Sequence, residues 1–155
     1  MIRIRRAAAG DLPAIQDLLR TSDLPVEGVA EGLARFLVAE TDGLLVGTAG
    51  IEMDSGCALL RSVAVEPAAR GEGVGIELVR QALRLASVSG AQSVYLLTTS
   101  AAGFFSRFGF VPALRAEVEA KFPDSHETRP GGICATAEAM ALRDLTRILQ
   151  PHRRD

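Results

Sequence analysis

The spacing of hydrophobic residues along the chain alternates between the two-residue period of strands and the longer period of helices. Short apolar runs separated by turn pairs such as Asp42-Gly43 predict antiparallel hairpins. After Glu66-Pro67 the pattern becomes helical, and Gly90 is well placed to end that helix. The predicted strands are residues 2–6, 36–40, 44–53, 57–65, 93–100 and 110–118, with a last one within 135–145. The predicted helices are residues 11–19, 29–34, 74–89 and 101–108.

The order of these elements predicts the fold. Residues 57–98 form a strand, a helix and a strand in succession, so the two strands should be parallel neighbours. The predicted class is therefore α/β, more strictly α+β. We expect a mixed, mostly antiparallel sheet of six to seven strands, flanked by helices, around a central parallel βαβ unit. We expect one domain over residues 1–145, a tail over 146–155 and a polar loop over 119–136.

Composition narrows the classes of function. The chain has 155 residues, 48% of them hydrophobic, and a net charge of −2, which gives no whole-chain attraction to nucleic acid or to a membrane surface. No run of about 18 apolar residues occurs, and no apolar stretch follows the basic N-terminus. We therefore expect no membrane span, no secretory signal and a cytoplasmic location. Two cysteines and two histidines lack zinc-site spacing, so no metal is expected.

The stretch ARGEGVGIELVR, residues 69–80, places three glycines beside Arg70 at the start of the longest predicted helix. Unpaired N–H groups at a helix start, glycines without Cβ atoms and a nearby cation suit a diphosphate. A P-loop is excluded because neither lysine nor a hydroxyl residue follows Gly75. The dinucleotide fingerprint is excluded because Ile76 or Leu78 stands where its last glycine belongs. A plain tight turn is an alternative reading.

Residues Arg70 to Gly75 match the pattern R/Q-x-x-G-x-G/A, and the stretch AGFFSRFGF at residues 102–110 has the form of a short helix ending in Gly-Phe. With these two motifs in this order of elements, the chain resembles the GNAT N-acetyltransferase superfamily over nearly its whole length. The resemblance implies acetyl-CoA as the cofactor and a small-molecule amine as the acceptor. Members of this superfamily are often homodimers.

The resemblance also implies roles for particular segments. Backbone N–H groups of the glycine loop would hold the cofactor diphosphate, and the end of strand 57–65 would pair with the pantetheine arm. Strands 57–65 and 93–98 would splay apart and leave a slot for the thioester. The residues predicted to bind the cofactor are Val63, Val65, Arg70, Gly71, Gly73, Val74, Gly75 and Phe105.

Acetyl transfer to an amine requires a proton for the departing thiolate. Many relatives supply it from a tyrosine in the short helix, but this chain has Phe105 there, and its one tyrosine, Tyr95, lies on the preceding strand. Three hypotheses follow. The thiolate leaves unaided or is protonated by water, a hydroxyl of Thr98, Thr99 or Ser100 donates or relays, or catalysis is weak or lost. We favour water assisted by a hydroxyl, with Thr98 and Thr99 as the catalytic candidates.

The remaining site candidates are charged or polar residues near the expected slot. Glu52 ends a central strand and is the candidate base, ahead of Glu40 and Glu66; the alternative is a solvated strand-end carboxylate. Arg61 and Ser62 should face the hydroxyls of the neighbouring strand. An arginine beside hydroxyls could clamp a substrate carboxylate. The alternative is an exposed strand arginine.

The strings LRSVAV and YLLTTSAAGFFSRFGF are similar to the arsenic-resistance N-acetyltransferase subfamily. Its enzymes acetylate glutamate-like amino acids such as arsinothricin or phosphinothricin, so the resemblance implies a small acidic amino acid as substrate. A peptide or aminoglycoside acetyltransferase is a rival, disfavoured because no paired carboxylates are expected near the slot. A non-catalytic acyl-CoA-binding module is a second rival. Loop 119–136 either covers the slot or is a passive surface loop.

Overall fold

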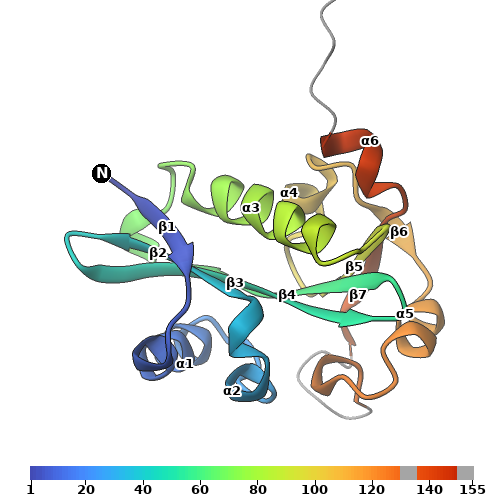
Figure 1. Cartoon of the computed structure of the whole chain (residues 1–155), viewed down its shortest axis with the longest axis horizontal. Coiled ribbons are helices and arrows are strands. Elements are labelled where there is room, and N and C mark those ends of the chain that lie inside the picture. Colours follow the sequence, from blue (N-terminus) through green and yellow to red (C-terminus); the bar gives the residue numbers. More distant parts are fainter. Residues whose placement is uncertain (130–135, 150–155) are drawn as a thin grey trace, which may run out of the picture.

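The computed structural model describes residues 1–129 and 136–149, which contain a seven-stranded sheet (Figure 1). The strands follow the order β1-β2-β3-β4-β5-β7-β6. Their bounds are β1 Arg3–Arg6, β2 Phe36–Thr41, β3 Leu44–Asp54, β4 Cys57–Val65, β5 Ser93–Thr98, β6 Val111–Ala113 and β7 Glu138–Leu142. Every neighbouring pair is antiparallel except β4 and β5, which confirms the predicted mixed sheet and its parallel unit.

Helices cover both faces of this sheet (Figure 1). Helix α3 crosses one face, with α4 and α6 on the same side, whereas α1, α2 and α5 lie against the opposite face. The helical bounds are α1 Leu12–Thr21, α2 Val29–Gly32, α3 Val74–Val88, α4 Ala102–Ser106, α5 Arg115–Lys121 and α6 Leu145–Leu149. Short 3-10 turns, labelled η, are η1 Ala9–Asp11, η2 Leu33–Arg35, η3 Pro67–Ala69 and η4 His126–Thr128.

Helix α3 packs on the sheet through one apolar side. The five positions predicted from the spacing are all buried: Leu78, Val79, Ala82, Leu83 and Ala86. They join residues of β3, β4 and β5 in the main hydrophobic cluster. The opposite face carries two separate clusters, one under α1 that includes Ile15 and Phe36, and one under α5 that includes Val118 and Phe122.

Strands β4 and β5 separate at one end. They pair from Cys57 with Ser93 to Leu60 with Leu96, and the pairing stops there although both strands continue. Just beyond, Ser62 has a φ of +58° at a β-bulge, where β4 gains one residue relative to β3. The predicted splaying therefore has a local cause, and beyond Leu60 no described strand pairs with the edge of β4 on the β5 side.

The region after Phe110 differs from its prediction. The sequence predicts a strand over 110–118 and a loop over 119–136, but the structure has the short β6 followed by α5 and η4. The segment is helical because Val118 and Phe122, four residues apart, bury one side against the sheet. Residues 130–135 of the predicted loop lie outside the described residues.

Helix α6 overlaps the start of the predicted C-terminal tail. Leu145 is fully buried, and helix α6 continues to Leu149, so the first residues of the predicted tail are helical. Residues 150–155 lie outside the described part. Within the two described ranges, no helix combines the length and the apolar character needed to cross a bilayer.

Candidate active site

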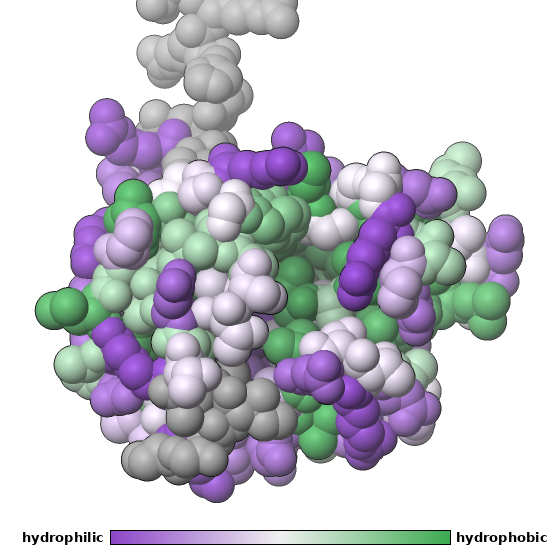
Figure 2. Space-filling view, turned by 180° about the vertical axis from the view of Figure 1, so that it is seen from behind, coloured by the Kyte–Doolittle hydropathy of each residue, from purple (hydrophilic) through white to green (hydrophobic). Residues whose placement is uncertain are grey.

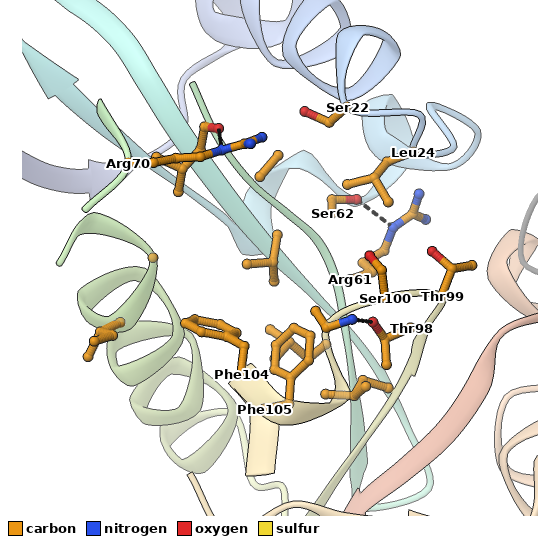
Figure 3. Close-up of a pocket in the computed structure, with 18 of the residues that line it drawn as sticks. Ser22, Leu24, Arg61, Ser62, Arg70, Thr98, Thr99, Ser100, Phe104 and Phe105 are labelled. Atoms are coloured by element: carbon orange, nitrogen blue, oxygen red, sulfur yellow. Dashed lines mark hydrogen bonds between the residues drawn. The ribbon is translucent and has the colours of Figure 1, made fainter. Parts of the chain in front are cut away.

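A cavity of about 940 Å³ opens where β4 and β5 separate (Figure 3). The ends of both strands, the glycine loop with the first turn of α3, helix α4 and residues 22–24 line it. The face seen in Figure 2 is hollowed near its middle, with hydrophobic side chains in the hollow and hydrophilic ones around it. A concave and largely apolar site with a few placed polar groups is typical of small-molecule binding.

The glycine loop forms one end of this cavity. Gly71 and Gly73 have φ values of +87° and +79°, and a Cβ atom built on either would meet nothing within 4 Å. Gly73 is the N-cap of the 15-residue helix α3, so Val74 and the next residues have N–H groups without intrahelical partners. The loop is thus an open curl of backbone donors at the positive end of a helix, which suits a phosphate group.

Arg70 and Gly75 flank this curl in different ways. The Nε of Arg70 donates to the carbonyl oxygen of Val65 at 3.2 Å, which lays the side chain across the end of β4 (Figure 3). A Cβ on Gly75 would lie 3.5 Å from Cζ of Phe104, an ordinary contact, so Gly75 brings α3 close to α4. The structure brings every predicted cofactor-binding residue to the cavity wall: Val63, Val65, Arg70, Gly71, Gly73, Val74, Gly75 and Phe105.

Phe105 occupies the position of the absent tyrosine. Its ring is 7% exposed and makes edge-to-face contacts with Phe104 and Phe110, at centroid distances of 5.1 Å and 6.0 Å. Tyr95 does not line the cavity, and its hydroxyl donates to Oε1 of Glu117 at 3.1 Å beside α5. Burial, and then this carboxylate, raise the pKa of Tyr95. The tyrosine of this chain is therefore held outside the cavity.

Three hydroxyl residues at the end of β5, Thr98, Thr99 and Ser100, line the cavity as predicted (Figure 3). The Oγ1 of Thr98 accepts the N–H of Ala101 at 3.0 Å. A hydroxyl that accepts through its oxygen still has its own proton to donate, so Thr98 can act as a donor toward the cavity.

Arg61 is buried, with 4% of its surface exposed, which rules out the exposed strand arginine. Its Nε lies 3.0 Å from Oγ of Ser62 and 3.2 Å from Oε1 of Glu127. Its Nη2 donates to the carbonyl oxygen of Glu27 at 2.7 Å, and its Nη1 lies 3.6 Å from Oε2 of Glu52. Acceptors of the chain itself therefore engage Nε and Nη2 of the predicted clamp, whereas Nη1 is buried without a hydrogen-bond partner among the described residues.

Glu52 does not line the cavity. It pairs with Leu59, before β4 and β5 separate, because antiparallel β3 runs away from the slot. Its Oε2 accepts the hydroxyl of Ser125 at 2.7 Å. The expectation that no paired carboxylates lie near the slot is wrong, because Glu52 and Glu127 flank Arg61 and because Glu127 and Asp23 line the cavity.

Sequence reasoning missed Glu127 because it lay in a predicted loop. Helix α5 and the turn η4 bring this segment back to the sheet, where Ser125 caps η4 by accepting the N–H of Glu127 at 3.1 Å. Thr128 ties the turn further by donating to the carbonyl oxygen of Phe122 at 2.8 Å. The available signal was the helical spacing of Val118 and Phe122. Glu127 therefore forms part of the cavity wall.

Comparison with known proteins defines the class. The family described as acetyltransferase (GNAT) domain matches residues 32–112. An amino-acid acetyltransferase of Mycobacterium tuberculosis is 33% identical over 117 residues, which cover 69% of this chain and 67% of that protein. A Mycobacterium tuberculosis protein solved in complex with CoA and NLQ superposes with a TM-score of 0.73 at 26% identity, over 91% of this chain and 98% of that one.

This chain belongs to the GNAT acetyltransferase family and is an N-acetyltransferase, which confirms the resemblance drawn from the two motifs. Some relatives are much longer. The amino-acid acetyltransferase of Pseudomonas fluorescens is 30% identical over 121 residues, and the match covers 71% of this chain but only 28% of that protein.

Proposed function

We propose that this chain transfers the acetyl group of acetyl-CoA to the α-amino group of an amino acid. The observation that carries the proposal is one continuous cavity that joins the open glycine loop to the polar residues at the end of β5. The similarity to an amino-acid acetyltransferase that shares 33% of aligned residues supports the substrate class. The similarity to a structure that contains CoA supports the cofactor.

In this proposal the backbone N–H groups of Gly71, Gly73 and Val74 bind the cofactor diphosphate, with Arg70 alongside. The unpaired edge of β4 at Val63 and Val65 binds the amides of the pantetheine arm. The thioester then lies between the separating strands.

The reaction forms a C–N bond and breaks a C–S bond, so the amine loses a proton and the thiolate gains one. We assign to Thr98, with Thr99 beside it, the delivery of a proton to the thiolate through water, because the Thr98 hydroxyl is oriented by Ala101. Glu52 would accept the amine proton only through an intervening group such as water, since its side chain is not part of the cavity lining.

A narrower form of the proposal names arsinothricin or phosphinothricin as substrate, in arsenic resistance. It depends on Arg61 being available for an acidic side chain, and two carboxylates lie within 3.6 Å of that guanidinium. Homodimerisation, which the family resemblance implies, is a separate part of the proposal and is measured by light scattering.

Thiol release from acetyl-CoA tests the function directly. The acceptor panel contains the common amino acids, arsinothricin, phosphinothricin, a polyamine and a lysine peptide. We expect turnover with at least one free amino acid. Turnover only with the polyamine or peptide would overturn the substrate class, and acetyl-CoA binding without turnover of any acceptor would support the binding-module rival.

A hydroxyl variant tests the proton route. Thr98→Val should lower the turnover number about tenfold or more while leaving the affinity for acetyl-CoA unchanged, since general acid catalysis contributes to the chemical step alone. Thr99→Val is the neighbouring comparison. Full activity in both variants would remove the hydroxyl hypothesis and leave water as the donor.

A further inference from the structure

The cavity has a cofactor end, at the glycine loop, and an acceptor end, at Arg61 (Figure 3). Three arginines of the described residues line it, and two of them have partners in the chain. Arg61 pairs with Glu127, and Arg70 donates to the carbonyl oxygen of Val65. The third, Arg107, is exposed, and its side chain forms no hydrogen bond or ion pair within residues 1–129 and 136–149. The described structure therefore leaves the charge of Arg107 without a partner.

Helix α4 places Arg107 at the cofactor end. The helix starts beside the slot, where the Ala101 N–H donates to Thr98, and Arg107 is the C-cap at its opposite end. The N–H of Arg107 donates to the carbonyl oxygen of Phe104 at 3.3 Å, and residues three apart in a helix project from the same side. The Cζ atom of Phe104 lies 3.5 Å from a Cβ built on Gly75. Arg107 therefore borders the cavity next to the first turn of α3.

Arg70 approaches the same turn from another direction. Its Nε binds the end of β4, and Figure 3 shows Arg70 and Phe104 on different sides of the start of α3. The glycine curl therefore has one arginine on its β4 side and another, Arg107, on its α4 side. An anionic group in the curl lies within the field of Arg70, whereas a second anionic group that projects toward α4 would meet Arg107.

Coenzyme A carries two separate anionic groups at its nucleotide end. One is the diphosphate, which the proposed function assigns to the glycine curl. The other is a phosphate monoester on the 3' position of the ribose, with a charge of about −1.5 to −2 near neutral pH and three oxygens that accept hydrogen bonds. The forked donors of a guanidinium match such a group with two parallel hydrogen bonds.

Resting on the proposed function, we propose that Arg107 binds the 3'-phosphate of coenzyme A and makes the enzyme selective for the complete cofactor. Dephospho-coenzyme A has the same arm, diphosphate and adenosine but lacks this phosphate. It keeps its contacts with the curl and with Arg70 and loses only the contact with Arg107. One side chain on α4, outside the glycine motif, thus distinguishes two otherwise identical cofactors.

Calorimetric titrations with acetyl-CoA and with acetyl-dephospho-CoA test this inference. The wild type should bind acetyl-CoA about tenfold or more tightly, the effect of hydrogen bonds between charged groups. In Arg107→Met, the affinity for acetyl-CoA should fall to that for the dephospho compound, and the affinity for the dephospho compound should stay at its wild-type value. Arg107→Lys should keep part of the preference, because an ammonium group supplies the charge without the fork.

Two further variants separate this contact from a general loss of positive charge. Arg84→Met removes an exposed arginine of α3 that does not line the cavity, so both affinities should stay unchanged. Arg70→Met should lower both affinities by the same factor, because both compounds carry the diphosphate.

Equal wild-type affinities for the two compounds would overturn the inference, as would an undiminished preference in Arg107→Met. A joint fall of both affinities in that variant would also overturn it, because it would indicate a purely structural role for Arg107. Failure of the proposed function is a different result. It would appear as the absence of turnover with every amino acid, whatever the ratio of the two affinities.

Discussion

The two ends of the cavity use different chemical groups: backbone N–H groups at one end and charged side chains at the other. The cofactor end uses backbone N–H groups from one short stretch, residues 70–75, at the start of α3. The acceptor end uses charged side chains from segments far apart in the sequence, since Arg61 is on β4, Glu52 on β3 and Glu127 on η4. A backbone cradle depends on glycine and on chain direction, whereas an ion-pair cluster depends on how distant elements pack.

This difference affects how easily a substitution changes the binding properties of each end. A curl of backbone donors at a helix start can bind a diphosphate through groups that every residue carries, provided that no side chain fills the curl. The cluster around Arg61 depends on the packing of three distant segments, and one substitution there changes its charge balance.

The largest effect should come from breaking the cluster at the acceptor end. Arg61→Met removes the cation between Glu52 and Glu127. We expect the free energy of unfolding in urea to fall by about 3 kcal/mol, because the buried Glu127 carboxylate loses its cationic partner Arg61. Arg143→Met is the control. Arg143 pairs with Glu117 at 2.7 Å but its side chain is 53% exposed, so its removal should cost far less. Equal losses in the two variants would contradict a buried cluster.

The next effect tests the cofactor end. Gly73→Val places a branched side chain in the open curl, so we expect affinity for acetyl-CoA to fall about tenfold or more through loss of a charge-assisted hydrogen bond. Gly90→Val is matched to it, because Gly90 lies at the other end of α3 with a φ of +98° and equally open space. Both variants should lose similar stability, and only Gly73→Val should lose affinity in calorimetry. Equal affinities would mean that the curl does not hold the cofactor.

The smallest effect concerns an ion pair that lies outside the cavity, between Arg5 and Asp11. Hydrogen bonds from Arg5, at 2.7 Å and 2.9 Å, hold the pKa of Asp11 at about 2, below its model-peptide value of 3.8. Because the pKa of Asp11 is lowered in the folded state, the ion pair with Arg5 stabilises the folded protein above about pH 4. This stabilisation is lost as the pH falls toward about 2. Near neutral pH, the free energy of unfolding in urea should be about 1 kcal/mol larger for the wild type than for Asp11→Asn, and this difference should disappear by about pH 2. A gap that stays constant with pH would show that charge is not the cause.

The same division explains how much could be read from the sequence. The α3 stripe of Leu78, Val79 and Ala82 and the loop of Gly71 and Gly73 are local patterns, and the structure agrees with both. The parallel pairing followed from the order of elements and the strand separation from the family resemblance, whereas the bulge at Ser62 did not show in the pattern.

The acceptor end was not predictable in the same way. Apolar residues in 110–118 were compatible with a strand, and only packing of Val118 and Phe122 on the sheet selects the helix α5. That error left Glu127 in an unassigned loop. Arg61 was correctly placed at the slot, but its burial and its three carboxyl or carbonyl neighbours come from residues up to 66 positions away, which no local pattern contains.

The most direct measurement is a set of titrations by calorimetry, with acetyl-CoA, with S-acetyl-4'-phosphopantetheine, which keeps the thioester, the arm and one phosphate, and with S-acetylpantetheine, which lacks the diphosphate and the adenosine 3'-phosphate. If the glycine loop holds the diphosphate, acetyl-CoA should bind one-to-one and about a hundredfold more tightly than S-acetylpantetheine, the worth of two charge-assisted hydrogen bonds, and the compound with one phosphate should lie between them. Equal affinity for S-acetyl-4'-phosphopantetheine and S-acetylpantetheine, or no measurable affinity for acetyl-CoA, would contradict the account.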